Sequence, residues 1–226
     1  MGNFRSACGP AAGPVNAGHN DGMDRAPASA GVPPDLEGHP DRLKWNARYR
    51  HLFAARFTPH PLAAAALALP LPDGPVLDLA SGPSGSALAA AAAGREVTAV
   101  DASEVALVML AKEAARRGLA GLVTPVQADL RAWRPGPGGY ALVLGTGYWD
   151  RQLFPDAAAA VAPGGLLGWE AFTAEARQTR PGLEPQWCLE EGEPAALLPP
   201  GYEVLAHPVA ATAPAGRRRL LARRAR

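Results

Sequence analysis

The chain has 226 residues, of which 22 are basic and 21 are acidic, so its formal net charge is +1. A nearly neutral chain has no global field that would recruit nucleic acid or a membrane surface, and no apolar run in it reaches the ~18 residues of a membrane span. The two cysteines form neither a disulfide framework nor a metal-spaced cluster, which is typical of a reducing compartment. We therefore expect a cytoplasmic protein without a bound metal, a nucleic-acid partner or a membrane anchor.

Residues 1–40 are rich in Gly, Pro and Ala and nearly lack large apolar side chains. Such a segment cannot bury enough surface to offset the entropy of ordering. We expect a disordered arm over residues 1–40, in which His39 is solvated, and one folded domain over residues 41–226, a length that suits a single sizeable core.

The first predicted helix covers residues 41–57, with Asp41 as its N-terminal cap. Its aromatic and apolar side chains recur at helical spacing and share one face. Two interpretations of this face stay open, namely packing in the core and a lid over a ligand. The side chains concerned are Trp45, Tyr49, Leu52 and Phe53. A short helix is possible at residues 62–69.

Residues 76–101 predict a strand, a tight turn, a helix and a second strand. The strand at 76–79 is apolar, as a buried parallel strand requires, and Gly82 and Gly85 allow the backbone to turn sharply and approach a ligand. Asp101 follows the turn by about 20 residues, the usual offset of an acid that binds ribose hydroxyls in nucleotide-binding units. The stretch therefore predicts a site for a nucleoside-bearing ligand.

Asp78 narrows the choice of ligand. In a dinucleotide site, an acid at the end of the first strand would repel the pyrophosphate at the helix N-terminus, whereas here it suits a cation such as the sulfonium of S-adenosylmethionine. The motif resembles that of class I S-adenosylmethionine-dependent methyltransferases, although Ala80 and Ser84 stand where glycines are usual. The resemblance implies a Rossmann-like α/β fold: a seven-stranded, mostly parallel sheet with an antiparallel last strand and helices on both faces.

The remaining elements follow in the order that this fold implies. Ser103 is the expected cap of a helix that ends at Gly118. We expect Val105, Leu107, Val108, Met109 and Leu110 to be the buried residues of this helix. Strands are expected at residues 122–127, 140–145 and 166–172, a helix at about 150–162, a loop with a short helix at 177–200, and antiparallel strands at 202–205 and 217–224. We expect the arginines of the last strand to form a solvated, charged edge.

The resemblance also implies which residues contact the cofactor. Asp129 and Leu130 stand where the family contacts adenine, although a helix cap is the alternative role for Asp129. The expected cofactor contacts are Trp45, Tyr49, Asp78, Ala80, Ser81, Gly82, Gly85, Asp101, Ala102, Asp129, Leu130, Gly145 and Thr146.

The segment after the fourth strand faces the methyl group, because ligands of open parallel sheets lie outside the carboxyl ends of the strands. It lacks the Asn/Asp-Pro-Pro-aromatic signature of nucleic-acid amino-methylating members. It also lacks the Pro-Cys pair of members that use a cysteine nucleophile. Residues 150–167 and the segment Trp45–Tyr49 resemble the small tellurite-resistance and thiopurine-methyltransferase-like branch. The expected acceptor contacts are Tyr148, Trp149 and Arg151, and the candidate catalytic residues are Tyr148, Asp150 and Glu170. The alternative role for Glu170 is an ion pair with Arg151 or Arg177.

The sequence thus predicts an S-adenosylmethionine-dependent enzyme that moves a methyl group to a small-molecule acceptor by in-line displacement, with its oligomeric state left open. Two alternatives stay open. One is a nicotinamide-dependent oxidoreductase on a similar sheet, against which Asp78 argues. The other is a methyltransferase-like binding protein whose site has decayed at Ala80 and Ser84.

Overall fold

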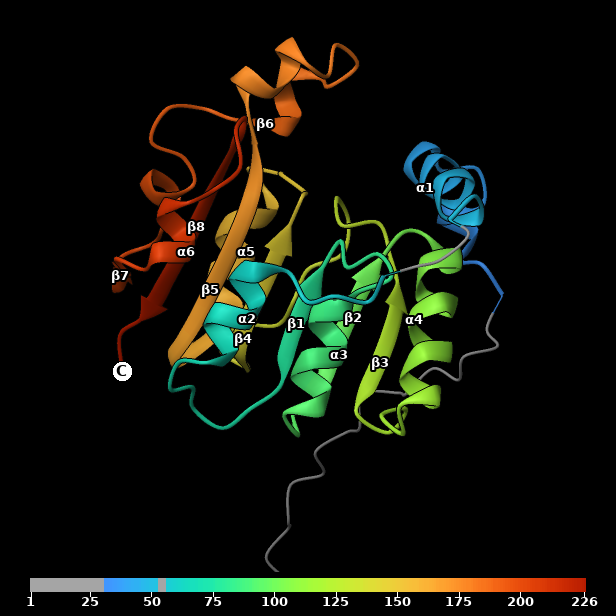
Figure 1. Ribbon diagram of the computed structural model, residues 1–226, viewed down its shortest axis with the longest axis horizontal. Coiled ribbons are helices and arrows are strands. Elements are labelled where there is room, and N and C mark those ends of the chain that lie inside the picture. The colour runs from blue at the N-terminus through green and yellow to red at the C-terminus, as the bar shows by residue number, and fades with distance from the viewer. Residues whose placement is uncertain (1–30, 53–55) are drawn as a thin grey trace, which may run out of the picture.

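The computed structural model describes residues 31–52 and 56–226, and these form an α/β structure around one twisted sheet (Figure 1). Seven strands follow one another in the order β3, β2, β1, β4, β5, β8, β7. The first five are parallel, and β8 is antiparallel to both of its neighbours. The short strand β6 pairs with the end of β5. This order confirms the expected class I methyltransferase fold. The bounds are β1 Val76–Leu79, β2 Val97–Asp101, β3 Val123–Gln127, β4 Tyr140–Thr146, β5 Val161–Thr173, β6 Cys188–Leu189, β7 Tyr202–Val204 and β8 Arg217–Arg224.

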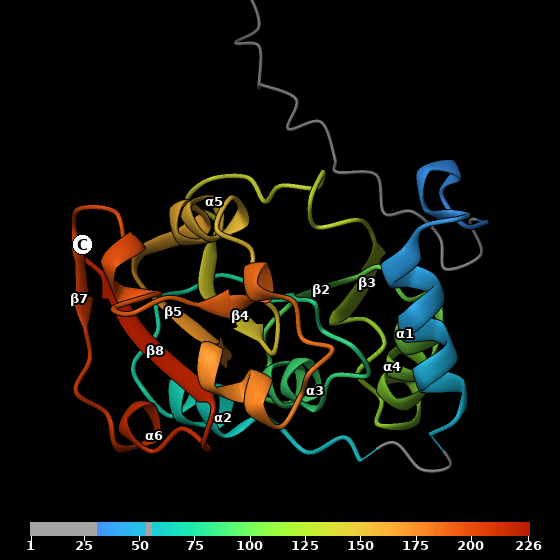
Figure 2. The ribbon, with the colours of Figure 1, turned by 90° about the horizontal axis from the view of Figure 1, so that it is seen from above.

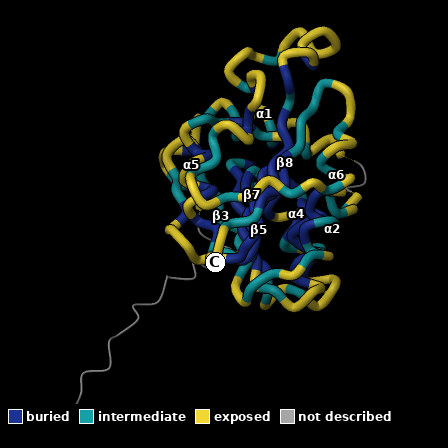
Figure 3. Tube along the Cα trace, turned by 90° about the vertical axis from the view of Figure 1, so that its left-hand side faces the viewer, coloured by how far each residue is buried: buried dark blue, intermediate teal, exposed yellow. Residues whose placement is uncertain are grey.

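Helices cover both faces of the sheet (Figure 2). Four of them, α2 (Pro61–Leu67), α3 (Gly85–Ala92), α4 (Glu104–Arg116) and α6 (Pro208–Ala211), lie on one face, and α5 (Leu153–Ala160) lies on the other. Each face has its own apolar cluster, and every residue of β1 is buried. Figure 3 shows the buried strands enclosed by more exposed helices and loops. In the described part of the chain, no helix combines the length and the apolar character needed to cross a membrane.

The helix caps account for where α3 and α4 begin. Ser84 accepts the Ala87 amide at 2.9 Å, and Ser103, the expected cap of α4, accepts the Ala106 amide at 3.2 Å. The expected buried face of α4 is confirmed at Leu107 and Leu110. Val105 and Met109 are only partly buried, and the expectation is wrong at Val108, which is 49% exposed.

The N-terminal helix α1 (Pro40–Arg50) is shorter than predicted. His39 rather than Asp41 is its cap residue. The core interpretation of its aromatic face is wrong at Leu52, which follows the helix and is 42% exposed. Phe53 lies outside the described residues.

The folded part of the chain begins before residue 41. Residues 1–30 lie outside the described part, but Pro34–Leu36 form a 3-10 helix whose Leu36 is fully buried. The Arg42 guanidinium holds this segment by donating to the Glu37 carbonyl at 2.6 Å. Residues 34–39 therefore pack against the folded part of the chain, although they lie within the segment expected to be a disordered arm.

The arginines of β8 do not form a solvated edge. The strand lies inside the sheet between β5 and β7, so its side chains reach neighbouring chain segments. Arg223 donates to the carbonyls of Pro70 and Gly164, and Arg224 donates to those of Ala159 and Val161. These arginines bind backbone carbonyls at the end of α5, in the first residues of β5 and in the segment after α2.

Candidate cofactor and acceptor site

Three carboxylates stand at the carboxyl edge of the parallel strands. Asp78 lies in β1, Asp101 ends β2 and Asp129 follows β3, and these strands are neighbours in the sheet. Ligands of open α/β sheets bind outside this edge. The structure therefore brings together the three acids that the sequence singled out.

Asp78 is a buried carboxylate with few compensating partners. Its side chain is 1% exposed and accepts a 2.5 Å hydrogen bond from the Ser84 hydroxyl. Burial raises the pKa of Asp78 to about 6, against the effects of the Ser84 hydrogen bond and of nearby His60. A carboxylate with so high a pKa favours the approach of a cation, which would restore its ionised form.

Asp101 is bound by two backbone amides. Its carboxylate accepts the Gly82 amide at 2.8 Å and the Ser103 amide at 2.8 Å. Burial raises the pKa of Asp101, and these two hydrogen bonds oppose the shift. The side chain thus ties the glycine-rich turn after β1 to the N-terminus of α4.

The turn after β1 keeps a tight shape although it lacks two of the usual glycines. Ala80 has φ +50° and Gly82 has φ +57°, and an alanine in this left-handed region costs about 1 kcal/mol. A Cβ on Gly85 would lie 2.4 Å from the Thr58 carbonyl. Ser84 caps α3 and donates a hydrogen bond to Asp78. A serine at this position, where glycine is usual, is therefore compatible with the turn.

The helix α1 lies above the carboxyl edge, over the end of α4 (Figure 1). The Tyr49 hydroxyl is 2.8 Å from the place that a Cβ on Gly82 would occupy. The Trp45 and Tyr49 rings stack with their centroids 5.8 Å apart. Burial, followed by the charge of Asp101, raises the pKa of Tyr49. These contacts place the Tyr49 ring beside the turn, with the Trp45 ring stacked on it.

A polar cluster that the sequence analysis missed anchors α1. Asn46, 1% exposed, donates to Glu104 at 2.8 Å and accepts the Ser103 hydroxyl at 2.6 Å. Arg42 adds two hydrogen bonds to Glu104 at 2.6 and 2.8 Å. The only sequence signal was an asparagine in a segment with two aromatic residues, Trp45 and Tyr49, which is weak evidence for burial.

Asp129 lies near the other end of α1. It accepts the Arg131 amide at 2.9 Å, and its carboxylate is 3.4 Å from His39 Nε2. His39 was expected to be solvated, but its side chain is only 15% exposed. Leu130 is buried in the apolar cluster below. The helix α1 therefore runs from Asp129 to the glycine-rich turn.

The remaining residues expected to contact the cofactor are positioned by backbone hydrogen bonds, by packing or by strand pairing. The Ser81 amide donates to the Val100 carbonyl, and the Ala102 carbonyl accepts the Gln127 side chain at 3.0 Å. A Cβ on Gly145 would lie 2.8 Å from the Trp169 ring, so a larger residue is excluded there. Thr146 pairs with Glu170 across β4 and β5.

On the acceptor side, Tyr148 is half-buried and Trp149 is not accessible. The Tyr148 ring lies 6.0 Å from Trp187 of the 174–200 segment, which connects β5 to β7. Burial raises the pKa of Tyr148. Trp149 is 1% exposed and packs against Phe154 and Trp169. The expectation that Trp149 contacts the acceptor is therefore wrong, because its ring fills the core.

Asp150 and Arg151 are engaged by the chain itself. Asp150 accepts the backbone amides of Gln152 and Leu153 at the start of α5. Arg151 donates to Glu193 at 2.8 Å and to the Cys188 carbonyl at 3.2 Å. Arg151 thus fixes the 174–200 segment against α5.

Glu170 is the centre of a buried ionic cluster. Its side chain is 2% exposed and accepts from Arg217, from Arg219 at 2.6 Å, and from His60 Nε2 at 3.2 Å. Burial raises the pKa of Glu170, but the hydrogen bonds from His60 and Arg219 outweigh it and hold the pKa at about 2. The expected partners Arg151 and Arg177 are wrong, and a carboxylate with so low a pKa is a poor proton acceptor.

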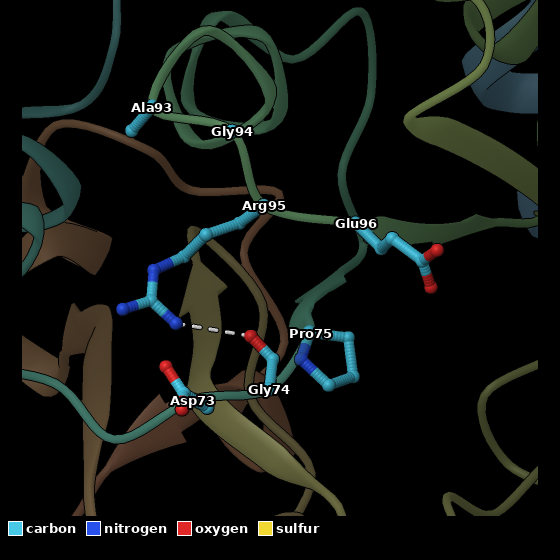
Figure 4. Close-up of a pocket in the computed structure, with 7 residues that line it drawn as sticks. All are labelled: Asp73, Gly74, Pro75, Ala93, Gly94, Arg95 and Glu96. Atoms are coloured by element: carbon cyan, nitrogen blue, oxygen red, sulfur yellow. Dashed lines mark hydrogen bonds between the residues drawn. The ribbon is translucent and has the colours of Figure 1, made fainter.

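A cavity of about 420 Å³ lies at the opposite edge of the sheet (Figure 4). Residues 73–75, before β1, and residues 93–96, before β2, line it. Arg95 donates across it to the Gly74 carbonyl at 3.0 Å. This cavity is remote from the three carboxylates. Within residues 31–52 and 56–226, no cluster of His, Cys, Asp and Glu is arranged to hold a metal ion.

Comparison with known proteins agrees with this fold. Residues 76–165 match the sequence family described as "Methyltransferase domain", whereas no curated protein sequence matches the chain. One similar structure, reported for the conversion of a disulfide bond into a thioacetal group during echinomycin biosynthesis, has a TM-score of 0.58 at 19% identity, with 81% of this chain and 91% of that chain covered.

Two further structures share the fold. Geranyl diphosphate C-methyltransferase from Streptomyces coelicolor A3(2) has a TM-score of 0.54 at 14% identity, with 83% of this chain and 98% of that chain covered. An S-adenosylmethionine-dependent methyltransferase from Thiobacillus denitrificans, bound to S-adenosylhomocysteine, has a TM-score of 0.54 at 21% identity, with 72% of this chain and 71% of that chain covered. The chain therefore has the fold of S-adenosylmethionine-dependent methyltransferases and carries a methyltransferase-domain sequence over residues 76–165.

Proposed function

We propose that this protein is an S-adenosylmethionine-dependent methyltransferase that acts on a small-molecule acceptor by in-line displacement. The observation that carries the proposal is the buried Asp78 beneath the glycine-rich turn, with a pKa of about 6. Such a carboxylate suits a ligand that carries positive charge. The structurally similar C-methyltransferase, which was crystallised with geranyl diphosphate, supports the proposal that the methyl acceptor is a small molecule. Placement in the tellurite-resistance-like branch and a cytoplasmic location are parts of the same proposal.

The residues at the carboxyl edge fit S-adenosylmethionine, which supplies an electrophilic methyl group on a sulfonium. Asp78, held by Ser84, would face its positive charge, and Asp101 would accept the ribose hydroxyls. Asp129 would lie at the adenine, near the start of α1. Trp45 and Tyr49 would cover the ligand, where cation–π attraction contributes roughly 0.5–2 kcal/mol.

Methyl transfer requires mainly that the acceptor is held in line with the breaking bond in a site that excludes water. Of the three candidate proton acceptors, Glu170 is ion-paired and Asp150 binds two amides. Tyr148 is the one that remains beside the acceptor region, and its raised pKa makes it reluctant to ionise. This arrangement favours an acceptor that reacts as an anion or a soft nucleophile and needs no strong base.

Separate calorimetric titrations with S-adenosylhomocysteine and NADH test the proposal. We expect binding of S-adenosylhomocysteine in the micromolar range and no binding of NADH. Binding of NADH alone would identify an oxidoreductase, and affinity for S-adenosylhomocysteine far weaker than micromolar would identify a decayed site. Consumption of the methyl donor over a panel of thiol, hydroxyl, amine and metalloid acceptors then identifies the substrate class.

Replacing Asp101 with alanine should weaken S-adenosylhomocysteine binding by about tenfold or more, because a hydrogen bond to an ionised acceptor is worth roughly 1.5–3 kcal/mol. The variant should also melt earlier than the wild type, since Asp101 holds two buried amides. Ser103→Ala, which removes a cap and an Asn46 contact, is the matched control for loss of stability. An unchanged dissociation constant in Asp101→Ala at a temperature where all variants are folded would rule out the ribose assignment.

Cofactor binding should slow amide hydrogen exchange in α1, since lids belong to the less stable parts of a structure. We expect slower exchange over residues 40–50 on adding S-adenosylhomocysteine, and a raised dissociation constant for Tyr49→Ala. Tyr49→Phe keeps the ring and should bind nearly as well as the wild type. Exchange that is already slow without ligand and unaffected by it would assign Trp45 and Tyr49 to packing alone.

A further inference from the structure

We propose that the methyl acceptor carries an anionic group, a carboxylate or a phosphate, and that Arg217 binds it with the assistance of Arg180. This inference rests on the proposed function, because it places the acceptor beyond the carboxyl ends of β4 and β5. It adds a substrate class and a specificity-determining residue to that function.

Arg217 lies where an acceptor would sit. It begins β8 opposite Phe172 of β5, at the end of the sheet that carries the 174–200 segment (Figure 1). Its Nη1 atom is 3.9 Å from the place that a Cβ on Gly147 would occupy. Gly147 directly follows β4, so the guanidinium borders the segment expected to face the transferred methyl group.

The charges around Arg217 do not balance. Glu170 is the only carboxylate of the described residues within 4 Å of Arg217 and Arg219, so one negative charge faces two positive ones. The side chains of Arg217 and Arg219 are only 25% and 7% exposed. His60, the third partner of Glu170, adds no negative charge. Charges withdrawn from water are costly unless they are paired, so the cluster would gain from an anion.

The Arg217 guanidinium has N–H donors without a hydrogen-bond partner among the described residues, whereas the Arg219 guanidinium has two partners. Arg219 donates to Glu170 and to the Val209 carbonyl. Among the described residues, Arg217 donates only through Nη1, to Glu170, although a guanidinium carries five N–H donors. The other arginines of β8 bind backbone carbonyls, as Arg218 does at Glu190 and Glu193. Arg217 therefore has guanidinium donors left for a ligand, and it is the arginine of this strand that borders Gly147.

A second guanidinium contacts the same aromatic ring, that of Phe172. The Arg217 guanidinium lies 4.1 Å from the centre of the Phe172 ring, and that of Arg180 lies 4.8 Å from it. Arg180 is exposed and has no ion pair in the part of the chain that the structure describes. An anion bound beside this ring would be attracted by both guanidiniums. Carboxylate and phosphate are the groups that arginine binds through paired N–H donors.

Calorimetric titration with inorganic phosphate and with succinate tests the inference, with and without S-adenosylhomocysteine. We expect the wild type to bind at least one of them in the millimolar range, and the tighter of the two indicates whether the acceptor carries phosphate or carboxylate. Arg217→Gln should weaken this binding by about tenfold and Arg180→Gln by a smaller factor, as charge-assisted hydrogen bonds imply. The control Arg116→Gln alters an exposed arginine of α4 and should bind as the wild type does.

Arg217→Lys covers the case in which Arg217→Gln fails to fold, because it keeps the charge and loses the fork of donors. Protection of Arg217 from phenylglyoxal by phosphate or succinate, followed by mass spectrometry, reports binding without any substitution. Once an acceptor is identified, Arg217→Gln should raise its KM about tenfold with little change in kcat. Absence of anion binding to the wild type, or equal binding by Arg217→Gln, would overturn the inference. If the wild type binds the anions but does not bind S-adenosylhomocysteine, the proposed function is overturned instead.

Discussion

Asp78→Asn is expected to stabilise the protein at pH 7.5 and to abolish its affinity for S-adenosylmethionine. The pKa of Asp78 rises from 3.8 to about 6 on folding because the carboxyl is buried. The contribution of Asp78 to stability is therefore most favourable where the group is protonated in both states, below about pH 4, and this contribution is lost as the pH rises through 6. At neutral pH the ionised group costs on the order of 2–3 kcal/mol. Asparagine removes this cost and still accepts the Ser84 hydroxyl.

Melting curves at pH 4.5, 6 and 7.5 check the first half of this expectation. The stability gained by Asp78→Asn should be greatest at pH 7.5 and small at pH 4.5. Calorimetry checks the second half, since the affinity of the wild type for S-adenosylmethionine should rise between pH 5 and pH 7 while that of the variant stays weak throughout. Ser84→Ala, which loses the hydrogen bond but keeps the carboxylate, is the control. A variant as stable as the wild type at pH 7.5 that binds equally well would contradict the role given to Asp78.

Glu170→Ala should destabilise the fold severely, by about 3–5 kcal/mol, because it leaves Arg219 and Arg217 buried without their carboxylate. Glu170→Gln should cost less, since it keeps one acceptor. The Glu170 pKa of about 2 lies below its ordinary 4.5. The stability that the ionised group contributes is therefore present above pH 4.5 and is lost as the pH falls toward 2.

Urea unfolding of the Glu170 variants measures this effect. Glu113→Ala is the matched control, because Glu113 pairs with Arg116 and Arg117 along the surface of α4, where such pairs contribute at most about 1 kcal/mol. If Glu170→Ala unfolds like the wild type and loses only activity, Glu170 has the catalytic role that the ionic cluster argues against.

The sheet and its three strand-end acids could be predicted from the sequence because local patterns determine them. Buried parallel strands are short apolar runs, and Asp78 and Asp101 each occur at the end of one. The cap of α4 at Ser103 was predictable for the same reason, since the hydroxyl and the amide that it binds are three residues apart.

Contacts between distant segments were not predictable in this way. Glu170 meets Arg219 because the register of β5 and β8 places them opposite each other, 49 residues apart in the chain. His60 reaches the same carboxylate from the segment before α2. Trp149 follows a strand end, where aromatic residues often contact ligands, yet its ring packs into the core. Only the three-dimensional packing separates these cases.

The attachment of α1 differs in kind from that of the rest of the fold. The only buried side chain of the helix is Asn46, and charged contacts link its N-terminal end to the body: His39 with Asp129, Asp41 with Arg131, and Arg42 with Glu104. The sheet and the other helices are held by apolar clusters. Dissolved salt screens partly exposed charges and leaves apolar contacts intact. A rise in ionic strength is therefore expected to loosen the N-terminal end of α1 from the body at salt concentrations at which the sheet stays folded.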